Sequence, residues 1–314
     1  MSDYLGLFKQ ELKEGLAEDP KRISSKWFYD KRGDELFVQI MQLPEYYLTR
    51  AEEEIFKEQT SQLADSLTGS FEAFDLFELG AGDGQKTFHL LRELDPKKFI
   101  YRPIDISSNA VHKLKGTVSF EFLNVQVDPI VGEYFHALEH LKSDRPKAIL
   151  FMGSNIGNLL DDLANDFLKR LSATMQSGDT LLIGVDLKKP KEIVLPAYND
   201  SAGVTAAFNL NVLERINREL GGDFVVQNFE HAPVYNEEDG IAYSYLRSTK
   251  DQRVTIEAIN GYYEFSKGEK LFTEISRKYD DAALEVITRD TSLDLMNRFF
   301  DEAHLFCDAV YRKR

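Results

Sequence analysis

Cysteine is almost absent from this chain, because Cys307 is the one cysteine among 314 residues. A single thiol cannot close an intrachain disulfide, so the sequence indicates a reducing compartment, and we expect a cytoplasmic protein. Long apolar runs are also missing, since no stretch reaches the roughly 18 residues that a membrane-crossing helix requires. The start, MSDYLGLFKQELKEGL, mixes acidic and basic side chains and lacks the order of a signal peptide. We therefore expect a soluble protein.

Positive charge is in short supply. The chain has 38 Lys and Arg against 53 Asp and Glu, which gives a net charge of −15. Nucleic-acid binding draws most of its affinity from basic side chains that neutralise phosphates, and membrane surfaces attract basic amphipathic helices. The charge therefore argues against nucleic-acid and membrane partners. We expect a monomer that acts on a small molecule.

Short apolar runs alternate with helical stretches between residues 74 and 187. The strand-like runs are FDLFELG, FIYRPIDI, FEFLNVQV, KAILFMG and DTLLIGVDL, and helical patterns such as KTFHLLREL and NDFLKRLSATM separate them. Strand and helix in strict alternation produce a parallel sheet with helices on both faces. We predict a doubly wound α/β fold for this segment.

The pattern changes beyond residue 190. A long helical stretch, VTAAFNLNVLERINREL, precedes four strand-like runs, AYSYLRS, RVTIEAI, YYEFS and LFTEISRKY. Consecutive strands joined by turns favour antiparallel pairing. We expect a second, α+β lobe here, and helical spacing of apolar residues also marks the chain before residue 65.

The end of the first predicted strand carries the pattern of a cofactor loop. The sequence LFELGAGDG contains Glu78 and then glycines at alternate positions, Gly80, Gly82 and Gly84. Glycines let the backbone turn sharply and approach a ligand closely, and the following helix offers free N–H groups. Asp105 ends the next predicted strand, where a carboxylate can accept hydrogen bonds from both ribose hydroxyls. These features together predict an adenosine-type cofactor.

The glycine spacing distinguishes between cofactor families. Dinucleotide sites use G-x-G-x-x-G, but Gln85 occupies the last position, and the pattern from Glu78 to Gly84 is E-x-G-x-G-x-G. This spacing resembles the first motif of class I methyltransferases; the alternative is a glycine-rich turn of another α/β protein. Asp128, after the third predicted strand, could reach an adenine edge or could be a turn residue beside Pro129.

Five stretches resemble the histidine N-methyltransferase family of ergothioneine biosynthesis. They are residues 27–50, 77–87, 151–159, 198–224 and 271–279. The resemblance implies a class I methyltransferase (Rossmann-like) domain, 53–188 with 279–314, and a substrate-binding domain, 1–52 with 189–278. It also implies transfer of methyl groups from S-adenosylmethionine to the α-amino group of a free amino acid. L-Histidine, which would give Nα-trimethylhistidine (hercynine), is the expected acceptor.

The resemblance implies a role for each matching residue. The cofactor residues are Glu78, Gly80, Gly82, Lys86, Asp105 and Asp128. The residues around the amino acid are Tyr46, Gly153, Asn158, Tyr198, Glu274 and Ser276. Tyr29 and Phe37 are expected beside the reacting amine. Local pattern alone allows other interpretations, because such tyrosines can be core residues, Asn158 a helix cap and Glu274 part of a solvated face.

Ser244 departs from the family pattern. The histidine enzymes carry a methionine against the substrate ring at the matching strand, and this chain has Ser244 there. The departure keeps another aromatic acceptor, such as a tryptophan derivative, as an alternative to histidine.

Two other classes remain as alternatives. His136 to His140 reads H-A-L-E-H, which matches the H-x-x-E-H pattern of inverted zinc peptidases, although we expect no metal site. A protein that binds S-adenosylmethionine or an amino acid without turnover is the other. The number of polar candidates for a substrate pocket argues against it.

Overall fold

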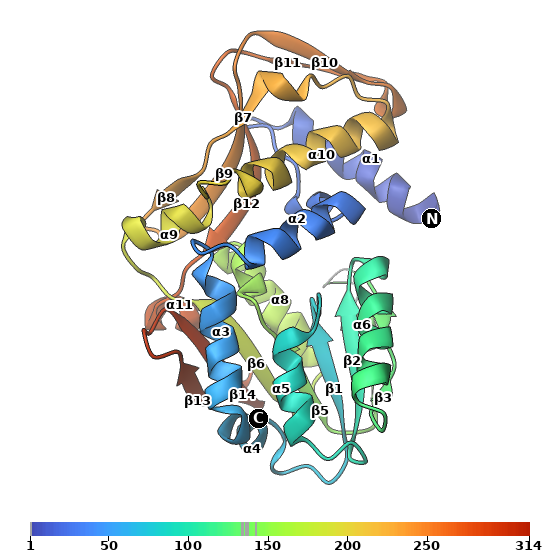
Figure 1. Cartoon of the computed structure of the whole chain (residues 1–314), viewed down its shortest axis with the longest axis vertical. Helices are drawn as coiled ribbons and strands as arrows, with labels where there is room; N and C mark the ends of the chain where they lie inside the picture. The colour runs from blue at the N-terminus through green and yellow to red at the C-terminus, as the bar shows by residue number, and fades with distance from the viewer. Residues whose placement is uncertain (1, 133–134, 136–137, 142) are drawn as a thin grey trace. The chain divides into compact units, whose positions relative to one another are not determined.

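The chain forms two compact units in the computed structural model, which describes residues 2–132, 135, 138–141 and 143–314 (Figure 1). The antiparallel-sheet unit comprises the chain up to Tyr46 and Pro190–Ser276, and the parallel-sheet unit comprises Tyr47–Lys189 and Arg277–Arg314. The backbone thus passes between the units three times. The division expected from the sequence, at residues 53, 189 and 279, remains a prediction for the domains.

The parallel-sheet unit is built on one mixed sheet. Its strand order is β13-β14-β6-β5-β1-β2-β3, with β4 beside β2. The five neighbouring strands β6-β5-β1-β2-β3 run parallel to one another. At one end of the sheet, β14 pairs antiparallel with both β6 and β13. The strands are β1 (Phe74–Leu79), β2 (Phe99–Asp105), β3 (Gln126–Val127), β4 (Ile130–Val131), β5 (Lys147–Phe151), β6 (Thr180–Asp186), β13 (Leu293–Phe300) and β14 (Phe306–Lys313).

Helices precede or connect these strands. They are α3 (Tyr47–Glu58), α4 (Thr60–Thr68), α5 (Gln85–Glu93), α6 (Ser108–Glu121), α8 (Asp161–Ala173) and α11 (Asp281–Thr288), with the short 3-10 helices η2 (Leu138–His140) and η3 (Asn155–Asn158). The strand order reverses at β1, which has β2 on one side and β5 on the other. Right-handed crossovers then place α5 and α8 on opposite faces. The sheet is therefore doubly wound, as the sequence predicts, and ligands of such sheets bind beyond the carboxyl ends at the reversal.

Burial follows the layer structure. Every residue of β1, β5 and β6 is buried, as expected where both faces of a strand are covered. The third strand is much shorter than the predicted run FEFLNVQV, because α6 continues to Glu121 and only Gln126–Val127 pair. Phe120 and Leu123 of that run are each 84% exposed, so its apolar character does not reflect a core strand.

The antiparallel-sheet unit combines helices with a small sheet and a hairpin. The sheet order is β12-β9-β7, with β8 beside β9, and β10 pairs with β11. The strands are β7 (Phe229–His231), β8 (Val234–Asn236), β9 (Ile241–Ser248), β10 (Gln252–Ile256), β11 (Gly261–Phe265) and β12 (Lys270–Arg277). The helices are α1 (Ser2–Ala17), η1 (Ser25–Phe28), α2 (Lys31–Met41), α9 (Lys191–Ala197), α10 (Val204–Leu220), η4 (Val226–Asn228) and η5 (Glu257–Ile259).

Helix α10 organises the core of this unit. Phe208, Val212 and Ile216 recur every four residues, so they form one apolar stripe, and all three are buried. The stripe belongs to a cluster that also contains Trp27, whose ring stacks on Phe8 at 4.2 Å. Burying a side chain such as Phe208, Val212 or Ile216 contributes roughly 1.5–3 kcal/mol. In the described ranges, no helix is long and apolar enough to cross a membrane.

Candidate functional site

The loop between β1 and α5 has the backbone that its glycines predict. Gly80, Gly82 and Gly84 have φ angles of 73°, 54° and 71°, a region that residues with side chains rarely adopt. The amides of Gly80 and Ala81 donate to the Ile104 carbonyl at 2.8 and 3.1 Å, which fixes the loop to β2. A Cβ atom on Gly82 would meet nothing within 4 Å, so space for a ligand lies beside it.

Asp105 lies at the end of β2 and contacts this loop. Its carboxylate accepts the Gly82 amide at 2.9 Å and the Ser107 amide at 2.8 Å, one on each oxygen. Burial raises the pKa of Asp105, although the backbone hydrogen bonds act in the opposite direction. Each carboxylate oxygen keeps further acceptor capacity. The structure thus brings two predicted cofactor residues together in an arrangement that fits a ribose diol.

Glu78 is buried in the sheet. Its side chain is 2% exposed, and its carboxylate accepts a hydrogen bond from the Tyr101 hydroxyl of the neighbouring strand. Burial raises the pKa of Glu78 to about 7. A direct role in cofactor binding therefore stays a prediction for this residue.

Lys86 and Gly153 meet at a residue that sequence reasoning missed. Glu52 of α3 is 1% exposed, and its carboxylate accepts hydrogen bonds from Lys86 of α5 and from the Gly153 amide, the latter at 2.8 and 3.0 Å. A Cβ atom on Gly153 would lie 3.7 Å from the Lys86 ammonium nitrogen. One predicted cofactor residue and one predicted substrate residue are thus held by the same buried carboxylate.

The segment after β5 continues into the short helix that ends at Asn158. Gly153 and Ser154 have φ angles of 70° and 55°, so the backbone turns sharply at the end of the strand. The buried Ser154 hydroxyl accepts the Asp186 amide at 3.0 Å, which ties the turn to β6. Asn158 is half-buried beyond this turn. Gly153 and Asn158 therefore lie at the same carboxyl edge as the loop after β1.

Asp128 follows β3, two strands from β1 in the sheet order. Its side chain is 55% exposed and forms an ion pair with Arg102 of β2. The Asp128 amide donates to the Tyr101 carbonyl at 2.9 Å. A contact between Asp128 and an adenine edge stays a prediction.

Three predicted site aromatics form one cluster in the antiparallel-sheet unit. The Tyr29 and Phe37 ring centres are 5.7 Å apart, and those of Phe37 and Tyr46 are 6.4 Å apart. Phe208 of α10 joins them, 5.6 Å from Tyr29 and 5.8 Å from Phe37. Sequence reasoning missed Phe208, although its place on the apolar stripe of α10 could have indicated it. Tyr29, Phe37 and Tyr46 are half-buried, and the faces of aromatic rings attract cations.

Tyr198 and Ser276 are also brought together. Tyr198, just after α9, is 7% exposed and donates its hydroxyl to the Ser276 hydroxyl of β12 at 2.7 Å. His231 Nε2 lies 2.9 Å from the Tyr198 carbonyl. Glu274 precedes Ser276 by two residues on β12 and is half-buried, so strand alternation places both side chains on one face.

Ser244 of β9 lies on the other face of the small sheet. The rings of Tyr243 and Tyr245 contact Phe272 of β12 at 6.5 and 5.8 Å, so these three share one face. Alternation puts Glu274 on the Phe272 face and Ser244 on the opposite one, where Ser244 is 2% exposed. Strand geometry does not bring Ser244 and Glu274 together, and the influence of Ser244 on substrate choice stays a prediction.

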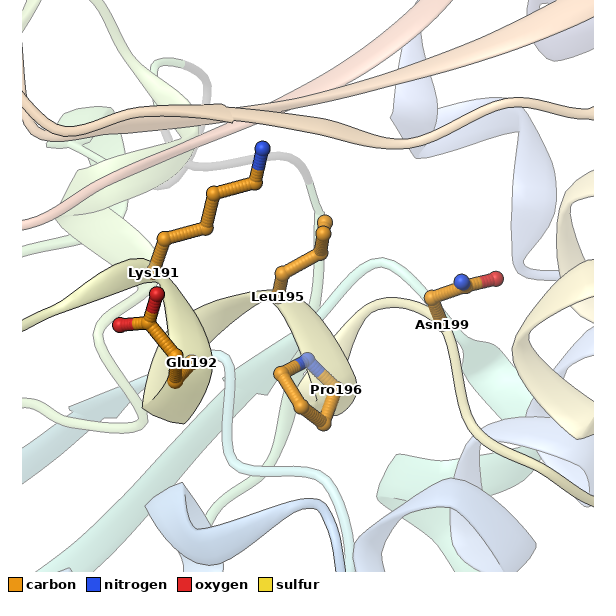
Figure 2. Close-up of a pocket in the computed structure, with 5 residues that line it drawn as sticks. All are labelled: Lys191, Glu192, Leu195, Pro196 and Asn199. Carbon is orange, nitrogen blue, oxygen red and sulfur yellow. The ribbon is translucent and has the colours of Figure 1, made fainter.

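One pocket of about 400 Å³ opens on α9, as Figure 2 shows. Its lining residues are Lys191, Glu192, Leu195, Pro196 and Asn199. None of these is a predicted site residue, although Asn199 follows Tyr198 in the chain. The pocket therefore adds no residue to the candidate site.

The zinc-peptidase pattern cannot be placed, since His136 lies outside the described residues. Among those that the structure does describe, there is no group of three or more His, Cys, Asp or Glu side chains that could hold a metal ion. The donor set around the loop after β1 fits an adenosine cofactor instead. It offers open space at Gly82, a carboxylate at Asp105 and an ammonium group at Lys86.

The chain is similar to known proteins over nearly its whole length. Residues 8–313 match the model of a family described as "Histidine-specific methyltransferase, SAM-dependent". A histidine N-alpha-methyltransferase of Mycolicibacterium smegmatis is 35% identical over 273 residues, 86% of this chain and 84% of the relative. One of Mycobacterium tuberculosis is 35% identical over 297 residues, 94% and 91% of the two chains.

A relative with lower sequence identity is named for a different substrate. The L-tryptophan methyltransferase of Psilocybe serbica is 28% identical over 327 residues, which cover 94% of this chain and 89% of the relative. The match to the family model and the two relatives at 35% identity span nearly the whole sequence. The chain therefore belongs to the histidine-specific, S-adenosylmethionine-dependent methyltransferase family, and it is an amino-acid N-methyltransferase with the class I α/β fold.

Proposed function

We propose that this enzyme transfers methyl groups from S-adenosylmethionine to the α-amino group of free L-histidine and forms Nα-trimethylhistidine. The observation that carries the proposal is the 35% identity, over nearly the whole chain, to two histidine N-alpha-methyltransferases. The arrangement of the predicted residues in each unit supports it.

The parallel-sheet unit supplies the donor side. S-Adenosylmethionine provides an electrophilic methyl group on a sulfonium. Asp105 would accept hydrogen bonds from the ribose hydroxyls, because its two oxygens lie at the end of β2 beside the Gly82 amide. Lys86 would pair with the carboxylate of the methionine portion. These contacts align the donor and leave little covalent chemistry for the protein to perform.

The acceptor side needs groups that hold an amino acid without protonating its amine. Asn158 and Tyr198 can hydrogen-bond the substrate carboxylate and add no competing cation. Glu274 and Ser276 would accept or share a hydrogen bond with the imidazole N–H. The hydrogen bond from Tyr198 to Ser276, 2.7 Å long, would fix the carboxylate and ring contacts relative to each other.

Each transfer requires a neutral amine, so the ammonium form of the substrate loses one proton before each of the three transfers. The Tyr29 hydroxyl would accept that proton directly or through water. Successive methylation ends in a quaternary ammonium group, which cannot donate a hydrogen bond. The rings of Tyr29, Phe37 and Tyr46 would tolerate such a cation through cation–π attraction.

A second candidate acceptor is another aromatic amino acid, such as a tryptophan derivative. The L-tryptophan methyltransferase that is 28% identical to this chain favours it, as does the serine at position 244. An indole N–H could use the same Glu274 acceptor as an imidazole. The two candidates therefore differ in ring size and not in the donor chemistry.

Incubation of the purified protein with methyl-labelled S-adenosylmethionine and single amino acids tests the proposal. We expect label on L-histidine and none on Nα-acetylhistidine, in which the amine is blocked but the imidazole is intact. Label on Nα-acetylhistidine would place the reaction on the ring. If the protein binds the donor but labels no amino acid, a binding protein replaces the enzyme.

A further inference from the structure

Three ionisable side chains meet inside the parallel-sheet unit. Glu52 of α3 and Asp308 of β14 are 1% and 0% exposed, and the Lys86 side chain is 22% exposed. Glu52 contacts the Lys86 ammonium group and accepts the Gly153 amide. Burying three charges costs free energy unless they compensate one another, so this cluster needs an explanation.

Gly184 makes room for both carboxylates. It lies opposite Asp308 in the register of β6 and β14. A Cβ atom there would fall 2.3 Å from Glu52 Oε1 and 2.9 Å from Asp308 Oδ1. Any other residue would displace one of the two acids. The glycine therefore leaves the space that lets the two acidic side chains lie close together.

Among the described residues, no N–H or hydroxyl group donates a hydrogen bond to either oxygen of Asp308. Burial and the negative charge of Glu52 raise the pKa of Asp308 well above its ordinary value, against the opposite effect of Lys86. The raised pKa favours the protonated form of Asp308, which could donate a hydrogen bond to Glu52.

Lys86 remains charged in this cluster. Burial alone would lower its pKa, but the charge of Glu52 and their hydrogen bond raise it overall. With Asp308 neutral, one ammonium and one carboxylate compensate each other. A lysine ammonium has three donors, so Lys86 can contact Glu52 and still offer a donor to a ligand.

We propose that Glu52 is a positioning residue of the methyl-transfer site, which holds the Lys86 ammonium group and the Gly153 amide in place, with Asp308 as the buried acid that hydrogen-bonds to it. The inference rests on the proposed roles of Lys86 and Gly153. Glu52 joins the helix after the glycine loop to the turn after β5. These are the two segments that flank the reversal of strand order at β1.

Calorimetry with S-adenosylhomocysteine tests this role without any amino acid. Glu52→Gln should weaken binding about tenfold or more, since a charge-assisted hydrogen bond is lost. Asp308→Asn should stay within about twofold, because the amide replaces the neutral acid as a donor to Glu52. The matched control is Asp179→Asn, a buried acid 2% exposed and paired with Lys147. It should lose stability and keep its donor affinity.

A double mutant separates positioning from general destabilisation. If Glu52 acts through Lys86, then Glu52→Gln should add less than about twofold once Lys86→Met is present. A folded Glu52→Gln variant with wild-type affinity for S-adenosylhomocysteine would overturn the proposal. That outcome would leave the assignment of the acceptor untouched, because no amino acid takes part in this measurement.

Infrared spectroscopy decides the case in which Glu52→Gln does not fold. Near pH 8, above the pKa of about 7 of Glu78, the wild-type protein should show a carboxylic-acid C=O band that Asp308→Asn lacks. Asp179→Asn should retain the band. Identical spectra for wild type and Asp308→Asn would show an ionised Asp308 and would refute its hydrogen bond to Glu52.

Discussion

Tyr47 donates its hydroxyl to Asp186, 3.0 and 2.8 Å from the two carboxylate oxygens. The same buried carboxylate forms ion pairs with Lys189 and with Lys278, the latter at 2.8 Å. Tyr47 begins the parallel-sheet unit, Lys189 ends its first segment, and Lys278 is the second residue of its last segment. One aspartate therefore fixes all three places at which the chain enters or leaves this unit.

Asp186→Asn should lower the free energy of unfolding by about 3–5 kcal/mol. The reason is that Lys278, 0% exposed, would lose the carboxylate that compensates its buried charge. Urea unfolding measures the change. Asp280→Asn is the matched control, because its ion pair with Lys188 is partly exposed to solvent and asparagine still caps α11. A loss below about 1 kcal/mol in Asp186→Asn would contradict a structural role of this size.

Glu78 predicts a pH dependence of stability. Burial raises its pKa from 4.5 to about 7, so the folded chain keeps a proton that the unfolded chain releases between these values. Stability should fall by about 3 kcal/mol as the pH rises through this window, and stay level above it. Glu78→Gln should lack this decline, as unfolding of both proteins from pH 5 to 8 would reveal. A difference between them that does not change with pH would contradict the shift.

The alternation of strands and helices from residue 74 to 187 was enough to predict the doubly wound sheet, because burial on both faces leaves uninterrupted apolar runs such as FDLFEL. The length of the third strand was predicted wrongly for a related reason. Its apolar run contains Phe120 and Leu123, which stay exposed, and sequence alone does not tell an exposed apolar residue from a buried one.

The site was predictable where a local pattern carries the chemistry. The glycine loop and Asp105 meet as expected, since both lie at carboxyl ends of neighbouring strands. Glu52 and Asp308 were missed because their partners are distant in the sequence. A signal existed, however: Glu52 lies on the buried face of α3 with Leu48 and Ile55, and an acid on an apolar face requires a partner.

Tyr29→Phe tests the proton acceptor. Phenylalanine keeps the ring contacts with Phe37 and Phe208 but removes the hydroxyl. We expect kcat to fall about 10²-fold, the lower range for a lost acid–base group, with donor affinity unchanged. Phe37→Leu provides a comparison that perturbs packing and leaves the hydroxyl. Steady-state rates with histidine give the answer, and an unaltered kcat in Tyr29→Phe would assign the proton to another acceptor.

Glu274→Ala tests recognition of the substrate ring. Loss of a hydrogen bond to a charged acceptor should lower kcat/KM for histidine about 10- to 100-fold. Alanine cannot accept a hydrogen bond from the imidazole N–H, and phenylalanine has no ring N–H to lose. The preference for histidine over phenylalanine should therefore shrink by the same factor. Glu264→Ala, on the hairpin strand β11, is the control and should change neither value. Equal losses for histidine and phenylalanine would show that Glu274 does not contact the ring.

A competition between equimolar histidine and tryptophan for S-adenosylmethionine, followed by mass spectrometry, tests the proposed activity most directly. We expect histidine to gain up to three methyl groups while tryptophan stays largely unmodified. Faster methylation of tryptophan, or histidine left without any added methyl group, would contradict it.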